Sequence, residues 1–463
     1  MDLQGIKIQK LFGDFDYTIS LNPKEGITIL SGPNGYGKTT ILNIIFHFFK
    51  QNFFFFQYLN FESITFFFPN ENNIIITKYE NEETIQIIKD LDDDEESISE
   101  KFSFIDIILE LRINDKRIET FTFNSDIERK LFNNIIKLYP NIKRASQRQL
   151  YDSNTGNYID IEDYFHKISL KPFDIIKDYI KQNDQIGVLI KILTSVDVYL
   201  IKEQRLIKPI ANISRRSVNS PNTRRSFTYT IQSYATELSD LIRIRQAEAF
   251  QESQKLDNSF PNRIMLAEKK LSIEDFNTRI QSLTEKQKQL QQFGITLSNI
   301  EKPAYNNEKA DVLSVYLDDA EKKTGFFDDL VKKINLFVTI INEKKFVKKE
   351  ILINSHSGFD FITKGDKKLI LTALSSGEQQ EVVVMYELLF RSQPNTLILI
   401  DEPEISLHVS WQKVFINDLL SISNIKNISF LLATHSPQII NGRWDLTTDL
   451  HKLLNDNGTA DRE

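Results

Sequence analysis

A glycine-rich segment near the start of the chain has the residue types of a phosphate-binding loop. Residues 31–40 read S-G-P-N-G-Y-G-K-T-T, and the apolar residues 27–30 come directly before them. In the pattern G-x-x-x-x-G-K-[ST], backbone N–H groups surround the phosphates, the lysine reaches the β- and γ-phosphates, and the hydroxyl binds Mg²⁺. A chance glycine turn is the alternative, and the apolar segments on both sides argue against it. The residues expected to bind a nucleoside triphosphate are Asn34, Gly35, Gly37, Lys38, Thr39 and Thr40.

Two neighbouring acidic residues follow an apolar segment near the other end of the chain. Residues 396–400 read as a buried strand, and Asp401 and Glu402 come directly after it. An aspartate at the end of such a strand can hold Mg²⁺ through its water shell, and the adjacent glutamate can orient or deprotonate the attacking water. We therefore expect Asp401 to serve the metal and Glu402 to act in catalysis.

Two further motifs are weaker when each is taken alone. The apolar residues 428–432 lead to His435, which is then placed to sense the γ-phosphate, and residues 374–379 read L-S-S-G-E-Q before a predicted helix. A buried histidine is often only a satisfied core residue, and Ser375 and Glu378 also have the spacing of a helix capping box. The order of all four motifs, at the ends of separate predicted elements, argues against coincidence.

This ordered set resembles the ABC-type ATPases, and within them the SMC-like branch, over about residues 1–70 and 345–443. The resemblance implies an α/β fold, an ABC-type (SMC-like) P-loop ATPase head with a mixed sheet that is split by a mainly helical insertion. It implies ATP and Mg²⁺ as cofactors, and Lys38, Glu402 and His435 as catalytic residues. In this family the signature motif of one subunit closes over the ATP of another, so a homo-oligomer, either a dimer or a higher ring, is expected. The signature residues are Ser375, Ser376, Gly377 and Glu378.

The same family has a Q-loop that follows a strand at the start of the insertion. Residues 196–201 read as such a strand, and K-E-Q-R follows at residues 202–205. The resemblance makes Gln204 a candidate metal ligand beside Thr39 and Asp401. An exposed polar residue after an edge strand is the alternative interpretation of Gln204.

The motifs predict a head made of two separated halves. Residues 1–124 are expected to form its N-terminal half with the phosphate loop, and residues 346–463 its C-terminal half with the signature and the acidic pair. Residues 125–345 are expected to form the mainly helical insertion or lid, which includes the Q-loop strand near residues 196–205.

Two longer helices are predicted in the insertion, at about Thr230–Leu256 and at Ile273–Gln292. Pro261 is expected to fix the break between them, because proline lacks the N–H group and restricts the residue before it. In the second helix the apolar face lasts barely two heptads, with Ser272 as a plausible N-cap. A long coiled coil is therefore disfavoured, and the lobe is expected to be a short lid or an oligomer contact.

The segment after the acidic pair departs from the wider family. Its D-E-P-E-x-S-L-H form, with His408 in the place of the D-loop aspartate, looks like the ATPase heads of prokaryotic defence proteins: the overcoming-lysogenization-defect nucleases, the Septu and retron-associated ATPases, and the ATPase subunit of the PARIS system. The resemblance implies an anti-phage sensor or scaffold that holds a separate effector nuclease and releases or activates it on infection. The effector would be Toprim-like, with an HNH nuclease as the alternative, and a phage-encoded protein would be the trigger. Only 28 residues follow His435, too few for a Toprim domain, so the nuclease is expected to be another chain.

Composition sets further limits on the class of protein. The formal net charge of −7 over 463 residues argues against a protein that coats nucleic acid, although the basic residues between 202 and 225 leave a local contact with DNA open. A DNA-repair or DNA-end-processing SMC-like ATPase is therefore the alternative function. The absence of cysteine fits a reducing compartment, and no uninterrupted apolar run of about 20 residues is present. We expect a cytoplasmic protein without a membrane partner.

Overall fold

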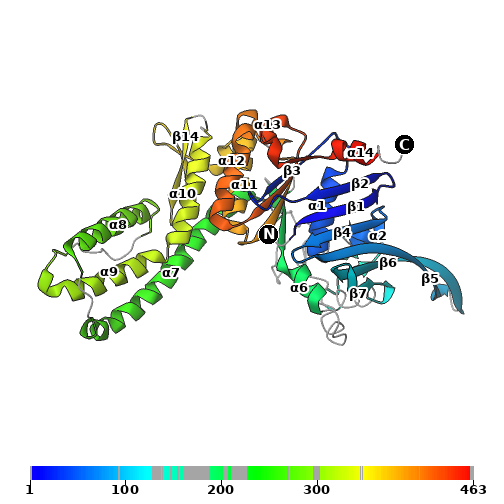
Figure 1. The fold of residues 1–463 in the computed structure, drawn as a ribbon, viewed down its shortest axis with the longest axis horizontal. Helices are drawn as coiled ribbons and strands as arrows, with labels where there is room; N and C mark the ends of the chain where they lie inside the picture. The colour runs from blue at the N-terminus through cyan, green and yellow to red at the C-terminus, as the bar shows by residue number, and fades with distance from the viewer. Residues whose placement is uncertain are drawn as a thin grey trace. The chain divides into compact units, whose positions relative to one another are not determined.

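Strands from both ends of the chain pair in one parallel sheet in the computed structural model (Figure 1). Every pairing in this sheet is parallel. Strands β3 (Ile27–Ser31), β17 (Thr396–Asp401) and β18 (Ser429–Ala433) are almost entirely buried apolar runs, which is typical of parallel strands covered on both faces. In spatial order the strands are β11 (Asp197–Ile201), β17 (Thr396–Asp401), β18 (Ser429–Ala433), β3 (Ile27–Ser31) and β19 (Thr447–Asp449).

The chain divides into two compact units. The first unit comprises Met1–Lys202, Gln393–Ile405 and Lys413–Glu463, and the second comprises Glu203–Ser392 and Ser406–Gln412. The structure describes residues 3–91, 94–127, 137, 139–145, 149–153, 156–160, 187–201, 207–209, 227–267, 271–295, 303–344, 346, 348–405 and 407–458.

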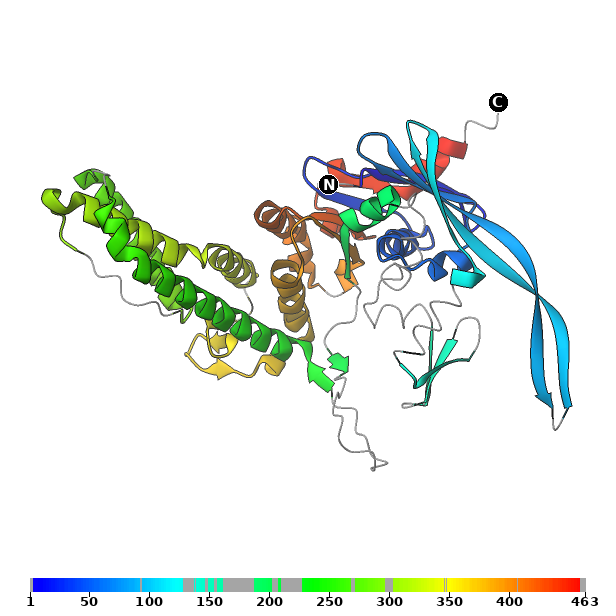
Figure 2. The same ribbon diagram turned by 90° about the horizontal axis from the view of Figure 1, so that it is seen from below.

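A second sheet in the first unit is antiparallel throughout. Its order is β2 (Phe15–Ser20), β1 (Gly5–Leu11), β4 (Ser63–Phe68), β5 (Asn72–Leu91), β6 (Asp94–Ile113) and β7 (Lys116–Phe123). Figure 2 shows β5 and β6 running on together as a ribbon beyond the other strands of this sheet. Of these two large sheets, one is thus purely parallel and the other purely antiparallel.

Helix α1 (Lys38–Phe49) lies between these two sheets. On one side it contacts β11, β17 and β18, and on the other the ring of Phe48 stacks on Phe66 of β4 with centroids 3.7 Å apart. The apolar side chains of α1 and of both sheets form one buried cluster, which holds the start of the helix against the parallel strands. The other elements of this unit are α2 (Phe54–Tyr58), β8 (Ile142–Arg144), β9 (Gln149–Asp152), β10 (Asn157–Asp160), α6 (Gly187–Ser195), η5 (Pro403–Ile405), α12 (Val409–Lys426, whose first residues fall in the second unit), α13 (Pro437–Ile440), η6 (Trp444–Leu446) and α14 (Leu450–Gly458).

The second unit is built mainly from helices. Helix α8 begins at the expected N-cap, since the Ser272 side chain accepts a hydrogen bond from the Asp275 N–H group. Its apolar face, with Phe276 and Ile280, packs on Leu317 of α9 in a buried cluster. Its elements are β12 (Ile207–Pro209), β13 (Phe227–Tyr229), α7 (Thr230–Met265), α8 (Ile273–Gln292), η2 (Asn307–Lys309), α9 (Ala310–Gly325), α10 (Asp328–Glu343), β14 (Lys349–Asn354), β15 (Gly358–Thr363), β16 (Lys368–Leu369), η3 (Leu371–Ala373), α11 (Ser376–Tyr386) and η4 (Glu387–Arg391).

The expected break at Pro261 is wrong. Helix α7 continues through this proline and ends only at Met265. Proline removes one backbone hydrogen bond and its ring crowds the preceding turn, so the helix needs other contacts to continue. The ion pairs among those contacts are made with another helix, α9, so a local sequence pattern does not predict them.

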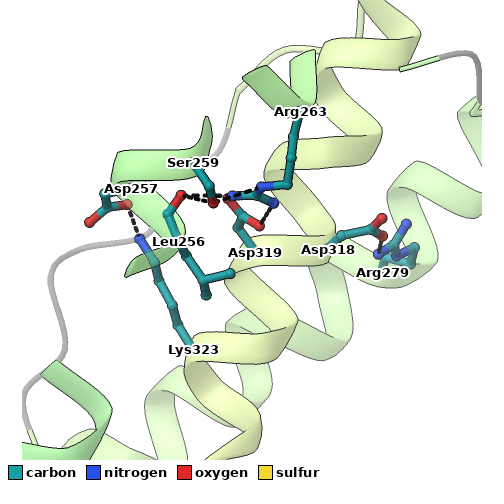
Figure 3. A network of polar contacts seen from close by, with 8 residues as sticks. All are labelled: Leu256, Asp257, Ser259, Arg263, Arg279, Asp318, Asp319 and Lys323. Carbon is teal, nitrogen blue, oxygen red and sulfur yellow. Dashed lines mark hydrogen bonds and ion pairs between the residues drawn. The ribbon is translucent and has the colours of Figure 1, made fainter. Parts of the chain in front are cut away.

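Ion pairs to α9 hold α7 on both sides of the proline (Figure 3). Asp257, before it, accepts a hydrogen bond from Lys323 at 2.6 Å. Arg263, after it, pairs with Asp319 through two hydrogen bonds, one of them 2.6 Å long, and also donates to the Leu256 carbonyl at 2.8 Å. The Arg263 guanidinium and the buried Asp319 carboxylate fix the last turns of α7 against α9. The helix therefore continues past Pro261.

The α/β class predicted from the sequence is confirmed by this architecture. The stretch 125–345, expected to be mainly helical, contains α6 to α10 and also the small three-stranded sheet β10-β9-β8. In the described part of the chain, no helix is both long and apolar enough to cross a membrane.

Replacing Asp319 with asparagine should loosen the end of α7. The change keeps the volume of the side chain but removes the charge that pairs with Arg263, a loss of about 1–2 kcal/mol. Amide hydrogen exchange over residues 256–265 should therefore become about 5- to 30-fold faster. Glu252→Gln is the matched control, since Glu252 forms an exposed pair with Lys255 on the same helix and its loss should leave exchange unchanged. Equal exchange in the two variants would contradict the role given to Asp319.

Candidate nucleotide-binding site

The loop between β3 and α1 has the backbone of a phosphate-binding loop. Gly35 and Gly37 have positive φ values of 88° and 78°, which other residues adopt with strain, and α1 begins directly after them at Lys38. The Lys38 ammonium is turned into the loop, where it donates to the carbonyls of Gly32 at 2.9 Å and Pro33 at 3.1 Å. The start of α1 therefore combines the backbone N–H groups of a helix N-terminus with the Lys38 ammonium, and this arrangement binds phosphate.

Oxygen atoms suited to Mg²⁺ meet at the edge of the parallel sheet. The register pairs Leu30 with Ala433 and Ala433 with Asp401, so β3, β18 and β17 end in one row. Across this row the Thr39 hydroxyl donates to Asp401 Oδ1 at 3.1 Å. Mg²⁺ in phosphate sites takes one or two protein oxygens and completes its shell with phosphates and water, and these two residues fit that requirement. Among the described residues, no three or more histidine, cysteine or acidic side chains are grouped so that they could hold a metal ion.

The residues after β17 and β18 bring two glutamates to one histidine. His435 Nδ1 lies 3.1 Å from Glu404 Oε1 and 3.8 Å from Glu402 Oε1. Glu402 has a φ of 41° and its N–H group bonds to the Ala433 carbonyl at 2.9 Å, so the chain turns sharply where β17 ends. A left-handed non-glycine residue costs about 1–2 kcal/mol, and such strain is found where function requires it.

Two aromatic side chains, Tyr17 and Phe12, lie beside the phosphate loop. No sequence motif predicted them. The Tyr17 hydroxyl donates to the Tyr36 carbonyl within the loop at 2.9 Å, and burial raises the pKa of Tyr17 to about 12, which keeps this donor protonated. Phe12, exposed at the turn between β1 and β2, has a ring carbon 3.6 Å from where a Cβ on Gly37 would lie. An exposed ring beside a phosphate loop can stack on a base. The only signal in the sequence is the cluster of aromatic residues around Gly13, which alone has no specific meaning.

The signature residues begin helix α11 in the second unit. Both halves of the capping box are present: the Ser375 side chain accepts from the Glu378 N–H group, and the Glu378 carboxylate accepts from the Ser375 N–H group. Burial works to raise the pKa of Glu378, but Lys349, with hydrogen bonds of 2.7 and 2.8 Å, and the Ser375 backbone outweigh it and lower the pKa. Ser375 and Ser376 stay exposed at the helix start. The capping-box interpretation is thus correct, and it leaves that helix start open to an anion.

The predicted site residues belong to two different units of the chain. Lys38, Thr39, Asp401, Glu402 and His435 lie around one edge of the parallel sheet in the first unit. Asn34 and Gly35 are exposed in the same loop, and Thr40 lies in the first turn of α1. Ser375, Ser376, Gly377 and Glu378 belong to the second unit, and Gln204 lies outside the described residues.

His408 has a local structural role before helix α12. Its Nδ1 atom accepts a hydrogen bond from the Ser410 N–H group at 3.3 Å and lies 2.8 Å from the Ser410 hydroxyl. The ring is exposed, so His408 is a surface residue beside the start of this helix.

The parallel sheet, the phosphate loop and the acidic pair together define a P-loop nucleoside triphosphatase. The sequence matches the family described as an AAA ATPase domain over residues 1–440, and the chain belongs to this family. The protein is an ATPase. No match to the sequence was found among curated proteins.

Similar solved structures include three SMC head domains. One is the Smc head domain with an extended coiled coil bound to the C-terminal domain of ScpA from Pyrococcus furiosus, 12% identical with a TM-score of 0.31. Another is an SmcHead bound to the C-winged helix domain of ScpA, 10% identical with a TM-score of 0.34. The third is the SMC head domain from Thermotoga maritima, 12% identical with a TM-score of 0.30. Each comparison covers 95% of this chain and 91% of the other.

Replacing Lys38 with alanine should weaken ATP binding by at least about 100-fold. The reason is the loss of a charge-assisted contact to the phosphates, which is worth about 3 kcal/mol in such a site. Titration with a fluorescent ATP analogue in the presence of Mg²⁺ measures the affinity. Lys50→Ala is the matched control, because Lys50 stands at the far end of the same helix and pairs with Asp197. An unchanged affinity in Lys38→Ala would refute the assignment of the loop.

Proposed function

We propose that this ATPase is an ABC-type, SMC-like switch whose subunits join around ATP. The observation that carries the proposal is the exposed start of α11, where Ser375 and Ser376 lie beside backbone N–H groups at the positive end of a helix. Such a helix start binds anions, and an ATP held on the phosphate loop of another subunit presents one. Closure over ATP then makes a homo-oligomer, either a dimer or a higher ring.

Within the closed site each residue has a separate task. ATP lies on the phosphate loop with Lys38 on its β- and γ-phosphates, and Mg²⁺ is held by Thr39 and Asp401, with Gln204 as a further ligand. Glu402 orients or deprotonates the attacking water, and His435 contacts the γ-phosphate. The proximity of Glu402 and His435 at 3.8 Å supports their action on the same end of the nucleotide.

We further propose that the switch belongs to an anti-phage defence system. The form of the acidic motif, residues 401–408 with His408 at its end, supports this role through its resemblance to the ATPases of such systems. In this proposal the ATPase works in the cytoplasm and holds a separate effector nuclease, Toprim-like or of the HNH type. A phage-encoded protein shifts the population of its closed and open states, and the nuclease is released or activated.

Mixing two inactive variants tests whether the site is shared between subunits. Lys38→Ala removes ATP binding, and Ser376→Arg blocks the signature; each alone should be inactive. A one-to-one mixture should recover activity, up to about a quarter of the wild-type rate for independent sites in a dimer, because half of the dimers are mixed and each has one intact site. The control mixture pairs Lys38→Ala with Glu402→Gln, whose defects fall on the same side of the shared site, and should stay inactive. No recovery in the first mixture, although mixed dimers form, would contradict the shared site.

Purification of the tagged Glu402→Gln protein from its native host, with ATP present, tests the defence role. This variant should bind ATP, hydrolyse it very slowly and keep its partners in the closed state. Mass spectrometry should find a small nuclease in a fixed ratio, and nuclease protection should find no DNA. The Lys38→Ala protein, which cannot close over ATP, is the control for partners that need the closed state. Bound DNA and repair factors without such a nuclease would instead favour the DNA-processing function.

A further inference from the structure

Glu404 is a buried acid beside the proposed catalytic residues. The proposed mechanism of hydrolysis, with Glu402 and His435, gives it no role. It lies in the short helix η5, and its side chain is 7% exposed, against 21% for Glu402 and 47% for His435. Burying a carboxylate is costly unless strong hydrogen-bond donors surround it. The structure therefore has to provide a reason for this acid, and its contacts give one.

Two donors from the segment after β18 converge on a single oxygen of Glu404, and the His435 ring lies beside the same oxygen. Oε1 accepts from the Thr434 hydroxyl at 2.7 Å and from the His435 N–H group at 2.8 Å. His435 Nδ1 lies 3.1 Å from the same atom. Glu404 thus joins the chain that follows β17 to the chain that follows β18, and it contacts both the backbone and the ring of the same histidine.

The contact to Nδ1 determines which ring nitrogen of His435 faces outward. An ionised carboxylate only accepts hydrogen bonds, so Nδ1 must carry a proton when it pairs with Glu404. The other nitrogen, Nε2, then points in a different direction from Nδ1, on a side chain that is 47% exposed as a whole. In catalytic triads a buried carboxylate holds a histidine in one orientation and one tautomer in the same way.

Glu402 does not make this contact itself. Its Oε1 atom is 3.8 Å from Nδ1, beyond hydrogen-bond distance, while Glu404, two residues later, is within it. The two acids therefore have separate tasks: one is left to act on water, and the other holds the histidine.

We propose that Glu404 is a positioning residue for ATP hydrolysis, which fixes the orientation and tautomer of His435 so that Nε2 faces the γ-phosphate. This inference rests on the proposed contact between His435 and the γ-phosphate. It assigns no chemical step to Glu404, which acts through the histidine alone.

A double-mutant cycle in ATP hydrolysis tests the proposal. Glu404→Ala should lower kcat by about 10- to 100-fold, the usual cost of losing a group that orients a catalytic one, with KM for ATP changed less than about 2-fold. His435→Ala should lower kcat at least as much, and the double variant should be no slower than His435→Ala. Thr434→Val is the matched control: it removes another donor to the same oxygen but leaves the ring contact, so its kcat should stay close to that of the wild type.

Two kinetic results would overturn the proposal. If the losses of Glu404→Ala and His435→Ala multiply in the double variant, Glu404 acts on its own and not through the histidine. If Thr434→Val loses as much kcat as Glu404→Ala, the network only holds the segment together. A wild-type rate in His435→Ala would also remove the basis of the inference, while leaving ATP binding and closure between subunits untouched.

A spectroscopic readout keeps the test independent of turnover. In protein labelled with ¹⁵N-histidine, the His435 signals, identified by their absence from His435→Ala, should show Nδ1 protonated. Glu404→Ala should lose this signature, and Glu404→Gln should restore it in part, because an amide oxygen still accepts a hydrogen bond. The same tautomer in wild type and Glu404→Ala would refute the positioning role, whatever the rates.

Discussion

The register of the parallel sheet is the constraint on which the site depends. Leu30, Ala433 and Asp401 stand in one row across three neighbouring strands, and the functional segments begin just beyond that row. The hydrogen bond from Thr39 to Asp401 joins residues that are 362 positions apart in the sequence. Because side chains alternate along a strand, a slip of one residue would turn Asp401 away from Thr39 and take apart the proposed metal site.

The buried cluster around α1 maintains this register. The helix is covered by the parallel strands on one side and by the antiparallel sheet on the other, with Phe48 stacked on Phe66. Interiors packed in this way resist displacement, so the start of the helix and its lysine keep their place relative to the acidic pair. The antiparallel sheet thus supports the site without supplying either of the two residues proposed to bind Mg²⁺, Thr39 and Asp401.

Polar contacts order two of the proposed functional segments, the start of α11 and the residues that follow β17. The capping box and Lys349 hold the Glu378 carboxylate, which orders the start of α11 and leaves its serines exposed. After β17, the left-handed Glu402 turns the chain, and the buried Glu404 lies 3.1 Å from His435 Nδ1. In both places a contact that first looks structural also fixes groups that we propose to face the nucleotide. The structural and functional interpretations of these motifs are therefore compatible.

The sequence by itself determined the α/β class and four strands of the parallel sheet, β3, β11, β17 and β18, and it predicted the residues of the phosphate loop and acidic pair, since apolar runs and glycine spacing are local signals. It also predicted the cap of α8 at Ser272. It did not predict the passage of α7 through Pro261, because the ion pairs to Lys323 and Asp319 that support it come from a distant helix. Only the tertiary structure decided that Glu404 holds His435 and that Phe12 lies beside Gly37, because the pairing of separate strands and the packing of a turn set those distances.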